Sequence, residues 1–319
     1  MHFDHRIASD RGASFLALSE DGCEHVLSLS PSLDDRPVVG DRVAAGDGRV
    51  LAIAPRRGVL ARARHDRAAP QPIAANLDVV FIVTAPGRDF SPARVERYLV
   101  AVHAAAAVPV VVLNKADLAD DIAELVAELY AVSGDAAVIA LSAERGDGCE
   151  ALAPYLSAGT TLALVGSSGV GKSTLANRLL GEARFAVGAV RASDGRGTHT
   201  STRRELAALP GGAWLVDTPG MRAFAPWAGG EDALDDVFAD VAAASERCRF
   251  RDCAHEREPG CAVRAEVEPG RYERWRALRA ELAYLDRRDD PVALAAERRK
   301  WKSIAKTMRS DDRRRSERS

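Results

Sequence analysis

A glycine-rich segment near the middle of the chain has the residue types and spacing needed to hold a phosphate chain. It follows the apolar run 161–165 and leads into a helical pattern at 175–180. Its residues are Gly166, Ser167, Ser168, Gly169, Val170, Gly171, Lys172, Ser173 and Thr174. Glycines let backbone N–H groups converge on a β-phosphate, Lys172 would reach the β- and γ-phosphates, and Ser173 would ligate Mg²⁺. The full pattern favours binding of a nucleoside triphosphate over a chance glycine turn before a helix.

A second segment, formed by Asn114, Lys115, Ala116 and Asp117, comes directly after a predicted buried strand. Ligands bind at this carboxyl edge of parallel sheets. The Asp117 carboxylate can accept hydrogen bonds from guanine N1–H and the 2-amino group, a pair of donors that adenine lacks. Asn114 would fix the loop and contact the base, and the Lys115 stem would lie over its face. Alone, this tetrapeptide would indicate only a solvated helix start, but beside a phosphate loop it predicts guanine recognition.

Two more strand ends complete the predicted nucleotide site. Ser142 and Ala143 follow the next strand and match a backbone contact to guanine O6. Asp217 closes a later strand and would hold Mg²⁺ through water, while the Gly220 N–H would sense the γ-phosphate. Many GTPases place a glutamine after that glycine, but this chain has Met221, whose thioether cannot orient the attacking water. Catalysis therefore needs another group, or it is very slow.

The hydroxyl-rich segment 195–202 lies between the phosphate loop and Asp217, in the position of a first switch loop. One of Thr200, Ser201 or Thr202 would reach Mg²⁺ when the γ-phosphate is present. His199 is the candidate that replaces the missing glutamine by positioning water or stabilising charge. The alternative is a loop histidine that contacts solvent or RNA.

Three thiols and one imidazole are gathered in the C-terminal third. Cys248, Cys253, His255 and Cys261 match the ligand set of a closed structural Zn²⁺ site, which would organise the fold and take no part in catalysis. The alternative is unpaired thiols beside a chance histidine. The remaining two cysteines, Cys23 and Cys149, are expected to be ordinary buried thiols. Arginines that would ring the site and suit a phosphate backbone are Arg247, Arg249, Arg251 and Arg257.

Charge is unevenly distributed along the 319 residues, although the net charge is only −2. Residues 49–67 carry six arginines against one acid, and residues 298–319 carry ten Lys/Arg against three acids. Two basic ends suggest a polyanionic partner, with arginine-rich composition for solubility as the alternative. No apolar run approaches the ~20 residues of a membrane span and no signal-peptide core is seen, so we expect a cytoplasmic protein with no membrane partner. We also expect a monomer.

The pattern of elements divides the chain into three domains. Residues 1–72 contain short β-type segments broken by turns, which predict an OB-type barrel, with an SH3-like barrel as the alternative. After a proline-bearing connection at 68–76, strands alternate with helices over 73–228 and predict a doubly wound parallel sheet. Residues 229–319 are expected to form a mainly helical zinc-binding domain with a basic tail. Strands are expected at 13–18, 25–29, 41–44, 49–53, 77–84, 108–113, 137–141, 161–165 and 213–216. One helix is expected to begin near Ser91 and Pro92, with Ser91 as its N-cap, and others to lie near 118–131, 148–157 and 175–180.

The order of the motifs is unusual. In ordinary GTPases the phosphate loop comes first, whereas here the segments 114–117 and 142–143 precede it and Asp217 comes last. Permutation only moves the chain ends, so the parallel sheet can still form. Its consequence is that the second switch, 217–224, runs directly into the following domain. We therefore expect GTP to tighten, and hydrolysis to loosen, binding to RNA.

Taken together, these motifs resemble the RsgA (YjeQ) family of bacterial, circularly permuted GTPases that depend on the small ribosomal subunit. The resemblance covers nearly the whole chain and implies an α/β fold: a permuted P-loop GTPase domain between an N-terminal OB-type barrel and a C-terminal zinc domain. It implies the cofactors GTP/GDP, Mg²⁺ and one Zn²⁺, binding to the small (30S) subunit and its 16S rRNA late in maturation, and a catalytic role for His199. Ser201 departs from the common His-Thr-Thr-Thr run, and the N-terminal segment is short, which suggests a trimmed barrel.

Three functions remain open at this point. The first is a slow GTPase that the small subunit stimulates. The second, motivated by Met221, is an RNA-binding assembly factor gated by nucleotide, whose hydrolysis is incidental. The third is a permuted GTPase of the large subunit, which the histidine in the first switch and the zinc ligands argue against.

Overall fold

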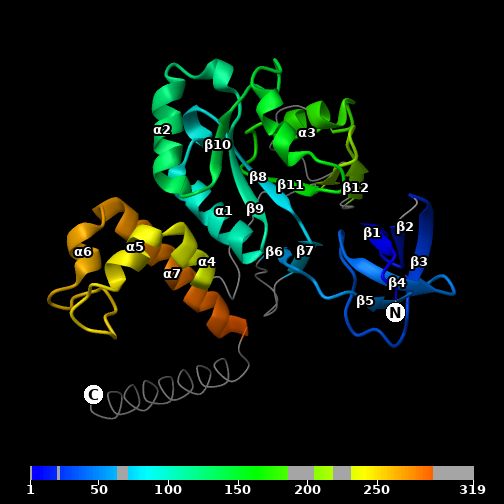
Figure 1. The fold of residues 1–319 in the computed structure, drawn as a ribbon, viewed down its shortest axis with the longest axis horizontal. Coiled ribbons are helices and arrows are strands. Elements are labelled where there is room, and N and C mark those ends of the chain that lie inside the picture. The colour runs from blue at the N-terminus through cyan, green and yellow to red at the C-terminus, as the bar shows by residue number, and fades with distance from the viewer. Residues whose placement is uncertain (1, 20–21, 63–70, 186–204, 218–230, 290–319) are drawn as a thin grey trace, which may run out of the picture.

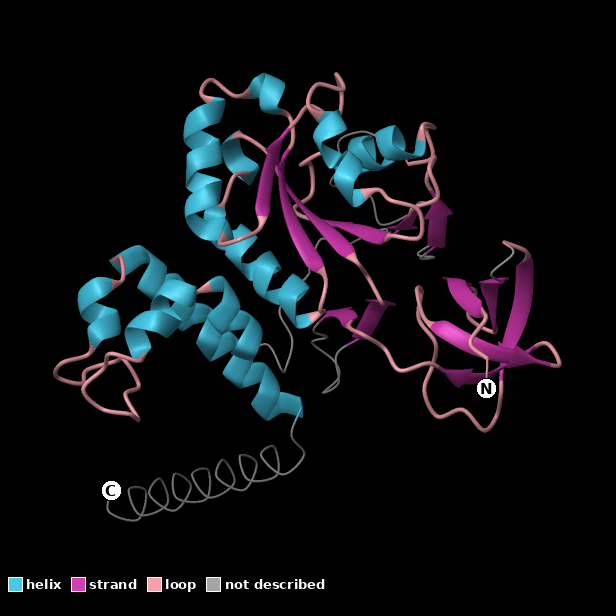
Figure 2. Ribbon diagram, viewed as in Figure 1, coloured by secondary structure: helices cyan, strands magenta, loops and turns pink. Residues whose placement is uncertain are grey.

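The computed structural model describes residues 2–19, 22–62, 71–185, 205–217 and 231–289. Three parts follow one another along the chain: a small β-barrel, a sheet covered by helices on both faces, and a group of helices (Figures 1 and 2). This is the architecture predicted from the sequence.

The N-terminal barrel is a closed ring of five strands. Strand β1 pairs with β2 on one side and with β4 on the other, and β3 pairs in parallel with β5, which closes the ring in the order β1-β2-β3-β5-β4. The barrel predicted from the turn spacing is thus confirmed, with all five strands present. Its strands are β1 (His5–Asp10), β2 (Ser14–Ser19), β3 (Glu24–Leu29), β4 (Arg42–Gly46) and β5 (Arg49–Ile53). The side chains inside it are Ile7, Phe15, Ala17, Leu27, Val43 and Val50.

A two-stranded hairpin connects the barrel to the next domain. Its strands, β6 (Val59–Arg62) and β7 (Gln71–Ala75), pair antiparallel. The proline-bearing segment was expected to be a plain connection, but β7 carries Pro72 in it. Proline is tolerated where a strand lies at an edge, and each strand of this pair is an edge strand.

The central sheet has the order β10-β9-β8-β11-β13-β12. The first five strands run parallel, as the alternating pattern predicts, and β12 is an antiparallel strand that the sequence analysis did not predict. Strand β12 also pairs with β1 of the barrel, where Ser9 lies opposite Glu205, so one sheet runs through both domains. The strands are β8 (Val79–Thr84), β9 (Val108–Leu113), β10 (Ala137–Ala140), β11 (Thr161–Val165), β12 (Glu205–Ala208) and β13 (Trp214–Asp217).

Helices cover both faces because alternate residues of the buried strands point to opposite sides. In β8, Val80 and Ile82 face the cluster that contains α1 and α2, while Phe81 faces the cluster that contains α3. Helix α1 begins at Ser91, whose side chain accepts from the Arg94 N–H, as predicted. The helices are η1 (Gly87–Asp89), α1 (Pro92–Ala104), η2 (Ala116–Leu118), α2 (Ile122–Ser133), η3 (Cys149–Tyr155) and α3 (Lys172–Leu180).

Two helix boundaries differ from expectation for local reasons. Helix α2 begins later than predicted, because Asp121 caps its N-terminus by accepting from the Glu124 N–H. The segment near 148–157 forms a 3₁₀ helix with Pro154 inside it, where a proline cannot donate the backbone bond of an α-helix.

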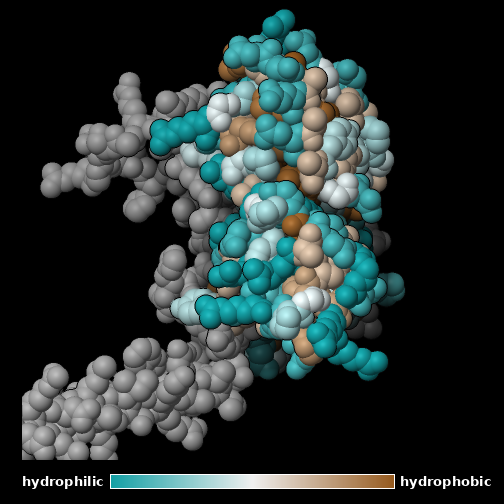
Figure 3. Space-filling model, turned by 90° about the vertical axis from the view of Figure 1, so that its left-hand side faces the viewer, coloured by the Kyte–Doolittle hydropathy of each residue, from teal (hydrophilic) through white to brown (hydrophobic). Residues whose placement is uncertain are grey.

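The C-terminal part is helical, as predicted, and packs against α1. Its helices are α4 (Glu231–Val237), α5 (Ala239–Ser245), α6 (Ala262–Glu266) and α7 (Pro269–Asp289). Phe238 is fully buried and Trp275 nearly so, in the same apolar cluster that covers one face of the sheet. The helical part and the sheet therefore share one core. Within the described residues, no helix is both long enough and apolar enough to cross a membrane. On the face drawn in Figure 3, apolar residues lie in narrow strips among hydrophilic ones.

Candidate nucleotide site and metal centre

The phosphate loop joins the end of β11 to the start of α3, as the sequence predicts. A Cβ at Gly166, with φ 143°, would meet the Val83 carbonyl O at 2.1 Å. A Cβ at Gly171, with φ 92°, would meet Asn114 Nδ2 at 2.2 Å. Both positions thus require glycine, because the loop passes directly against the ends of the neighbouring strands.

The side chains of this loop differ in how far they are buried and in what they contact. The Lys172 ammonium lies inside the loop and donates to the carbonyls of Gly166, at 2.8 Å, and Ser167. Val170 is fully buried and anchors the loop to the core. Ser168, Gly169 and Ser173 are exposed, and Thr174 is partly buried. A phosphate group that entered the loop would offer Lys172 a charged acceptor in place of two neutral carbonyls.

Asn114 connects the three loops of the predicted nucleotide site. Its Nδ2 donates to the Val170 carbonyl in the phosphate loop at 2.8 Å. Its Oδ1 accepts from the Ala143 N–H at 2.9 Å. The residue is 1% exposed, so these bonds replace water that cannot reach it. Asn114 thus joins its own loop to two others, while its contact to a base stays a prediction.

The neighbours of Asn114 leave the Asp117 carboxylate accessible. Lys115 adopts a left-handed conformation with φ 59°, and its ammonium donates to the Gly169 carbonyl at 2.6 Å. Asp117 lies in the short helix η2 and is exposed. Ser142 is buried and its hydroxyl accepts from the Arg145 N–H, which holds the turn that carries Ala143. The structure therefore brings 114–117, 142–143 and 166–174 together at the carboxyl edge of the sheet.

Two arginines that the sequence analysis did not single out support these loops. Arg178, in the last turn of α3, donates to the carbonyls of Ala143 and Glu144, the latter at 2.9 Å. Arg94 of α1 donates to the Ser167 hydroxyl in the phosphate loop. Neither arginine stands in a recognisable motif, because the contacts join residues 34 or more positions apart. Only the spacing of Arg178 after the loop, on the helix that the loop begins, could have pointed to it.

Cys149 lies behind the same turn. It is partly buried, its thiol donates to the Ser142 carbonyl at 3.8 Å, and burial raises its pKa, in keeping with the expected inert thiol. Cys23 was expected to be buried as well, which is wrong: it is exposed on the barrel. The hydrophobic character of cysteine does not decide burial in a hairpin turn.

The remaining predicted nucleotide residues are described only in part. Asp217 ends β13, where its backbone pairs with Glu205 of β12, so it stands at the same carboxyl edge as the phosphate loop. His199, Thr200 and Gly220 lie outside the described residues, as do Ser201, Thr202 and Met221. Their roles stay predictions.

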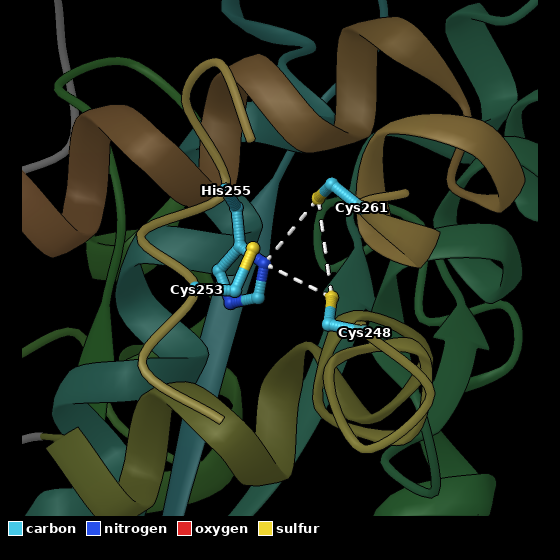
Figure 4. A group of neighbouring side chains, drawn as sticks. All are labelled: Cys248, Cys253, His255 and Cys261. Atoms are coloured by element: carbon cyan, nitrogen blue, oxygen red, sulfur yellow. Dashed lines mark hydrogen bonds between the residues drawn. The ribbon is translucent and has the colours of Figure 1, made fainter. Parts of the chain in front are cut away.

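The four predicted metal ligands converge on one point of the helical part. The ligand atoms of Cys248, Cys253, His255 and Cys261 all lie within 4.8 Å of one another (Figure 4). His255 Nδ1 lies 3.5 Å from the Sγ atoms of both Cys248 and Cys261, which are 3.9 Å apart. A tetrahedral ion with Zn–S bonds of about 2.3 Å and a Zn–N bond of about 2.0 Å would separate two sulfurs by about 3.8 Å and sulfur from nitrogen by about 3.5 Å. The donor set and its spacing therefore fit Zn²⁺.

The surroundings of His255 fix its ring. The residue has a left-handed backbone with φ 63°, and its carbonyl accepts from the Tyr272 hydroxyl at 2.6 Å. Its ring meets Trp275 edge to face at 5.6 Å. Both aromatic residues belong to α7, so the Cys₃His cluster and the long helix hold each other in place.

Several of the arginines predicted to meet a polyanion have internal partners. Arg247 pairs with Glu266 beside the metal centre, and the Arg249 guanidinium stacks over Phe250. In the barrel, Arg56 binds the buried Asp41 at 2.7 Å, with both carboxylate oxygens engaged. Arg247 and Arg249 are exposed despite these contacts, as are Arg251 and Arg257, whereas Arg56 is half-buried. A count of basic residues therefore overstates the charge available to a partner.

Comparisons with known protein families, curated relatives and solved structures all find the same family. The family model described as RsgA GTPase matches residues 53–227. The chain is 47% identical over 297 residues to a small ribosomal subunit biogenesis GTPase RsgA from Opitutus terrae, covering 87% of this chain and 81% of the relative. It resembles the crystal structure of YjeQ from Thermotoga maritima with a TM-score of 0.65 and 26% identity, over 88% of this chain and 98% of the other. YloQ, described as a circularly permuted GTPase, matches with a TM-score of 0.60 and 24% identity, over 88% of this chain and 94% of that one, which supports the fold.

Proposed function

The chain belongs to the RsgA family of GTPases, and on that premise we propose that it hydrolyses GTP to GDP and phosphate while bound to the small (30S) ribosomal subunit late in its maturation. The fold is that of a circularly permuted GTPase, and the chain is a GTP hydrolase that acts in ribosome biogenesis. Binding to the subunit and its 16S rRNA, action as a monomer and a place in the cytoplasm are parts of the proposal.

One observation carries the nucleotide part of the proposal. Asn114 joins the phosphate loop to the turn at Ala143 through two buried hydrogen bonds, and Lys115 holds Gly169. The loop that would read the base is thus connected directly to the loop that would hold the phosphates. A chance glycine turn or a solvated helix start would have no reason to share a buried asparagine.

Guanine selection rests on Asp117. The carboxylate is exposed at the carboxyl edge of the sheet, within the segment that Asn114 and Lys115 fix. It would accept from guanine N1–H and the 2-amino group, while the Ala143 backbone would meet O6. An adenine would leave this carboxylate facing groups that donate no matching pair of hydrogen bonds, which costs binding energy.

Hydrolysis requires charge stabilisation and a positioned water. Backbone N–H groups of 166–171 and the Lys172 ammonium would bind the β- and γ-phosphates. Ser173 and Asp217 supply the oxygen donors that a hard cation prefers and would hold Mg²⁺, with Thr200 as a further candidate ligand; the ion when bound neutralises the developing phosphate charge. We assign His199 the role of orienting the attacking water, since Met221 cannot. Water then attacks the γ-phosphorus in line with the bond to the leaving GDP oxygen.

The Cys₃His centre is proposed to hold one structural Zn²⁺. All four positions of a tetrahedral ion would be taken by protein ligands, so the ion would supply fold stability and no open site for chemistry. It would order the loop 248–261 and dock it on α7. The exposed Arg251 and Arg257 of this loop are available to contact rRNA phosphates.

The test is GTP turnover with and without purified small subunits, with large subunits and ATP as controls. We expect small subunits alone to raise turnover of GTP, by at least about tenfold, and ATP to be inert. His199→Ala should lose about a hundredfold of the stimulated rate while GDP affinity is unchanged. If small subunits bound but left turnover unchanged, the chain would instead be an RNA-binding factor gated by nucleotide. If large subunits stimulated it, the assigned partner would be wrong.

Co-sedimentation tests the coupling between nucleotide and RNA. We expect a non-hydrolysable GTP analogue to tighten small-subunit binding relative to GDP, because the second switch leads directly into α4. Equal affinities in the two nucleotide states would contradict this coupling and leave the hydrolysis assignment standing.

A further inference from the structure

A polar pocket lies between the barrel and the GTPase sheet. Its volume is about 450 Å³. The barrel contributes Arg6 of β1 and Arg42 of β4, the connection contributes Arg57, and the sheet contributes Asp78 and Thr161. Asp78 and Thr161 stand at the amino ends of β8 and β11, whereas the phosphate loop follows the carboxyl end of β11. The pocket is therefore on the opposite edge of the sheet from the nucleotide site.

Two of its arginines stand in an unfavourable arrangement. Arg6 and Arg42 are direct partners across the antiparallel pair β1–β4, so their side chains share one face. Like charges directly opposite each other in a sheet are destabilising. Among the described residues neither arginine makes an ion pair with a carboxylate. The fold thus keeps a repulsive pair at the wall of a pocket.

The Arg6 guanidinium also has fewer hydrogen-bond acceptors around it than it has N–H donors. Its Nη2 donates to the Thr161 hydroxyl, but its Nε is buried and has no hydrogen-bond partner among the described residues. Burial, with the charge of Arg42 adding to it, lowers the pKa of Arg6 to about 10, so the guanidinium stays charged at neutral pH. A buried cation that lacks acceptors costs free energy, which a bound anion would offset.

Asp78, the one acid among the described residues that line the pocket, is already engaged. Asp78 Oδ1 accepts from Arg57 Nη2 at 2.7 Å, and its Oδ2 accepts from the Thr161 N–H at 2.8 Å. Three guanidinium groups therefore face one carboxylate, and the pocket has a surplus of positive charge. Arg57 is positioned by Asp78 and by the Asn76 carbonyl, which aims it along the same wall.

We propose that this pocket binds a phosphate group, held by Arg6 and Arg42 with Arg57 at its rim. Guanidinium groups match phosphate oxygens with paired N–H donors, and the concave, polar wall excludes bulk water on one side. The phosphate can come from an RNA backbone or from a small phosphorylated molecule, because both present the same oxygens. A ligand here would touch both domains at once and would hold the barrel against the sheet.

The test uses the full chain saturated with Mg²⁺ and GDP, so that the phosphate loop is occupied. Inorganic phosphate is titrated in a sulfate-free buffer of constant ionic strength, and the thermal unfolding temperature is followed. We expect phosphate to raise it in the wild type. Arg42→Gln, an exposed position, should weaken phosphate affinity by at least about tenfold, and Arg42→Lys should retain part of it. Arg49→Gln removes the same charge from the exposed start of β5, outside the pocket, and should behave as wild type.

A second measurement is independent of ligand. In phosphate-free buffer, Arg42→Gln should unfold at a higher temperature than wild type, because the repulsion across β1–β4 is gone. If phosphate stabilised the GDP-bound wild type and Arg42→Gln equally, or stabilised neither, the proposal would be overturned. The proposal does not depend on GTP hydrolysis, since no step measures turnover and GDP serves only to fill the phosphate loop.

A short oligoribonucleotide separates the two sources. If it displaces phosphate and loses affinity in Arg42→Gln relative to Arg49→Gln, the group bound is an RNA backbone phosphate. If it leaves phosphate bound, and Arg42→Gln does not change its affinity, the pocket takes a small phosphorylated molecule. Either result supports a phosphate site.

Discussion

Glu96 of α1 and Arg271 of α7 form an ion pair across 175 positions of the chain, with Oε1 and Nη1 2.8 Å apart. Arg274 donates to the other carboxylate oxygen at 2.7 Å. Glu96 is fully buried, and burial raises its pKa, an effect that the hydrogen bonds from Arg274 and Arg271 oppose only in part. Helix α1 also carries Arg94, which contacts Ser167 of the phosphate loop. The same helix therefore touches the nucleotide site and the helical domain.

Removal of the Glu96 carboxylate should loosen the helical domain. Glu96→Ala leaves Arg271 and Arg274 without their buried partner, so we expect a loss of about 3 kcal/mol in the free energy of unfolding. Hydrogen exchange should rise mainly in α7 and in α1. Glu128→Ala, an exposed glutamate on α2, is the matched control and should change neither. Unchanged exchange in α7 would show that apolar packing alone holds the two parts together.

The Glu96 carboxylate should also make the free energy of unfolding depend on pH, in a direction that its pKa defines. Because its pKa is raised in the folded protein, the native state holds this proton more tightly than the unfolded state. The stabilisation that this proton gives the folded state is complete below the ordinary glutamate pKa, and it is lost as the pH rises through the raised pKa of Glu96. Urea unfolding from pH 4 to 7 should therefore show wild type losing stability relative to Glu96→Gln as pH increases. A difference that grew in the opposite direction would mean that the arginines dominate.

The Asn114 side chain should be required for nucleotide binding because it positions two other loops. Asn114→Ala removes two buried bonds and unlinks the phosphate loop from the turn at Ala143. We expect GDP affinity to fall at least about tenfold and stability to fall by about 1–3 kcal/mol. Asn177→Ala also removes two bonds, both to the backbone of Phe185, and links no nucleotide loops. Calorimetric GDP titrations should separate the two variants, and equal losses of affinity would reduce Asn114 to a general stabilising role.

Asp117 should decide which base is accepted. Asp117→Asn replaces an acceptor by an amide that can donate, which suits the 2-oxo group of xanthine better than the 2-amino group of guanine. We expect GTP affinity to fall at least about tenfold and xanthosine triphosphate affinity to rise. The exposed position makes a folding defect unexpected. Competition with a fluorescent GDP analogue measures the affinities for GTP and for xanthosine triphosphate. An unchanged preference for GTP would show that Asp117 does not contact the base.

Metal removal should affect the helical domain first. Cys261→Ser, or a strong chelator, should release one Zn²⁺ per chain, lower the unfolding temperature and raise hydrogen exchange over 248–285. Cys23→Ser changes an exposed cysteine on the barrel and should keep the full metal content. Atomic absorption and a chromogenic chelator give the stoichiometry. A wild-type chain that bound no zinc after purification without chelators would refute the metal assignment.

Local patterns were enough to predict which segments would come together, because the residues of 114–117, of 166–174 and of the Cys₃His cluster each lie within a short stretch of chain. Strands β8, β9 and β11 could also be predicted from the sequence, because their continuous apolar runs indicate burial on both faces. Contacts between distant segments were not predictable. The spacing of Arg178 after the loop hints at a role there but does not name the turn at Ala143 as its partner, and nothing near Arg56 indicates that Asp41 pairs with it. Strand β12 was missed because it is four residues long and gains its stability from neighbours on both sides.

The pairing of β12 with β1 means that the barrel is not a removable module. Strand β12 lies between β13 and β1 and pairs with β1 at Glu205, so a fragment without the N-terminal strands would leave the backbone of β12 at this point without its partner. Such an unprotected edge invites pairing with a second chain. Truncations meant to isolate the GTPase domain should therefore self-associate through this edge, and an inward-facing lysine introduced on β12 would be the remedy.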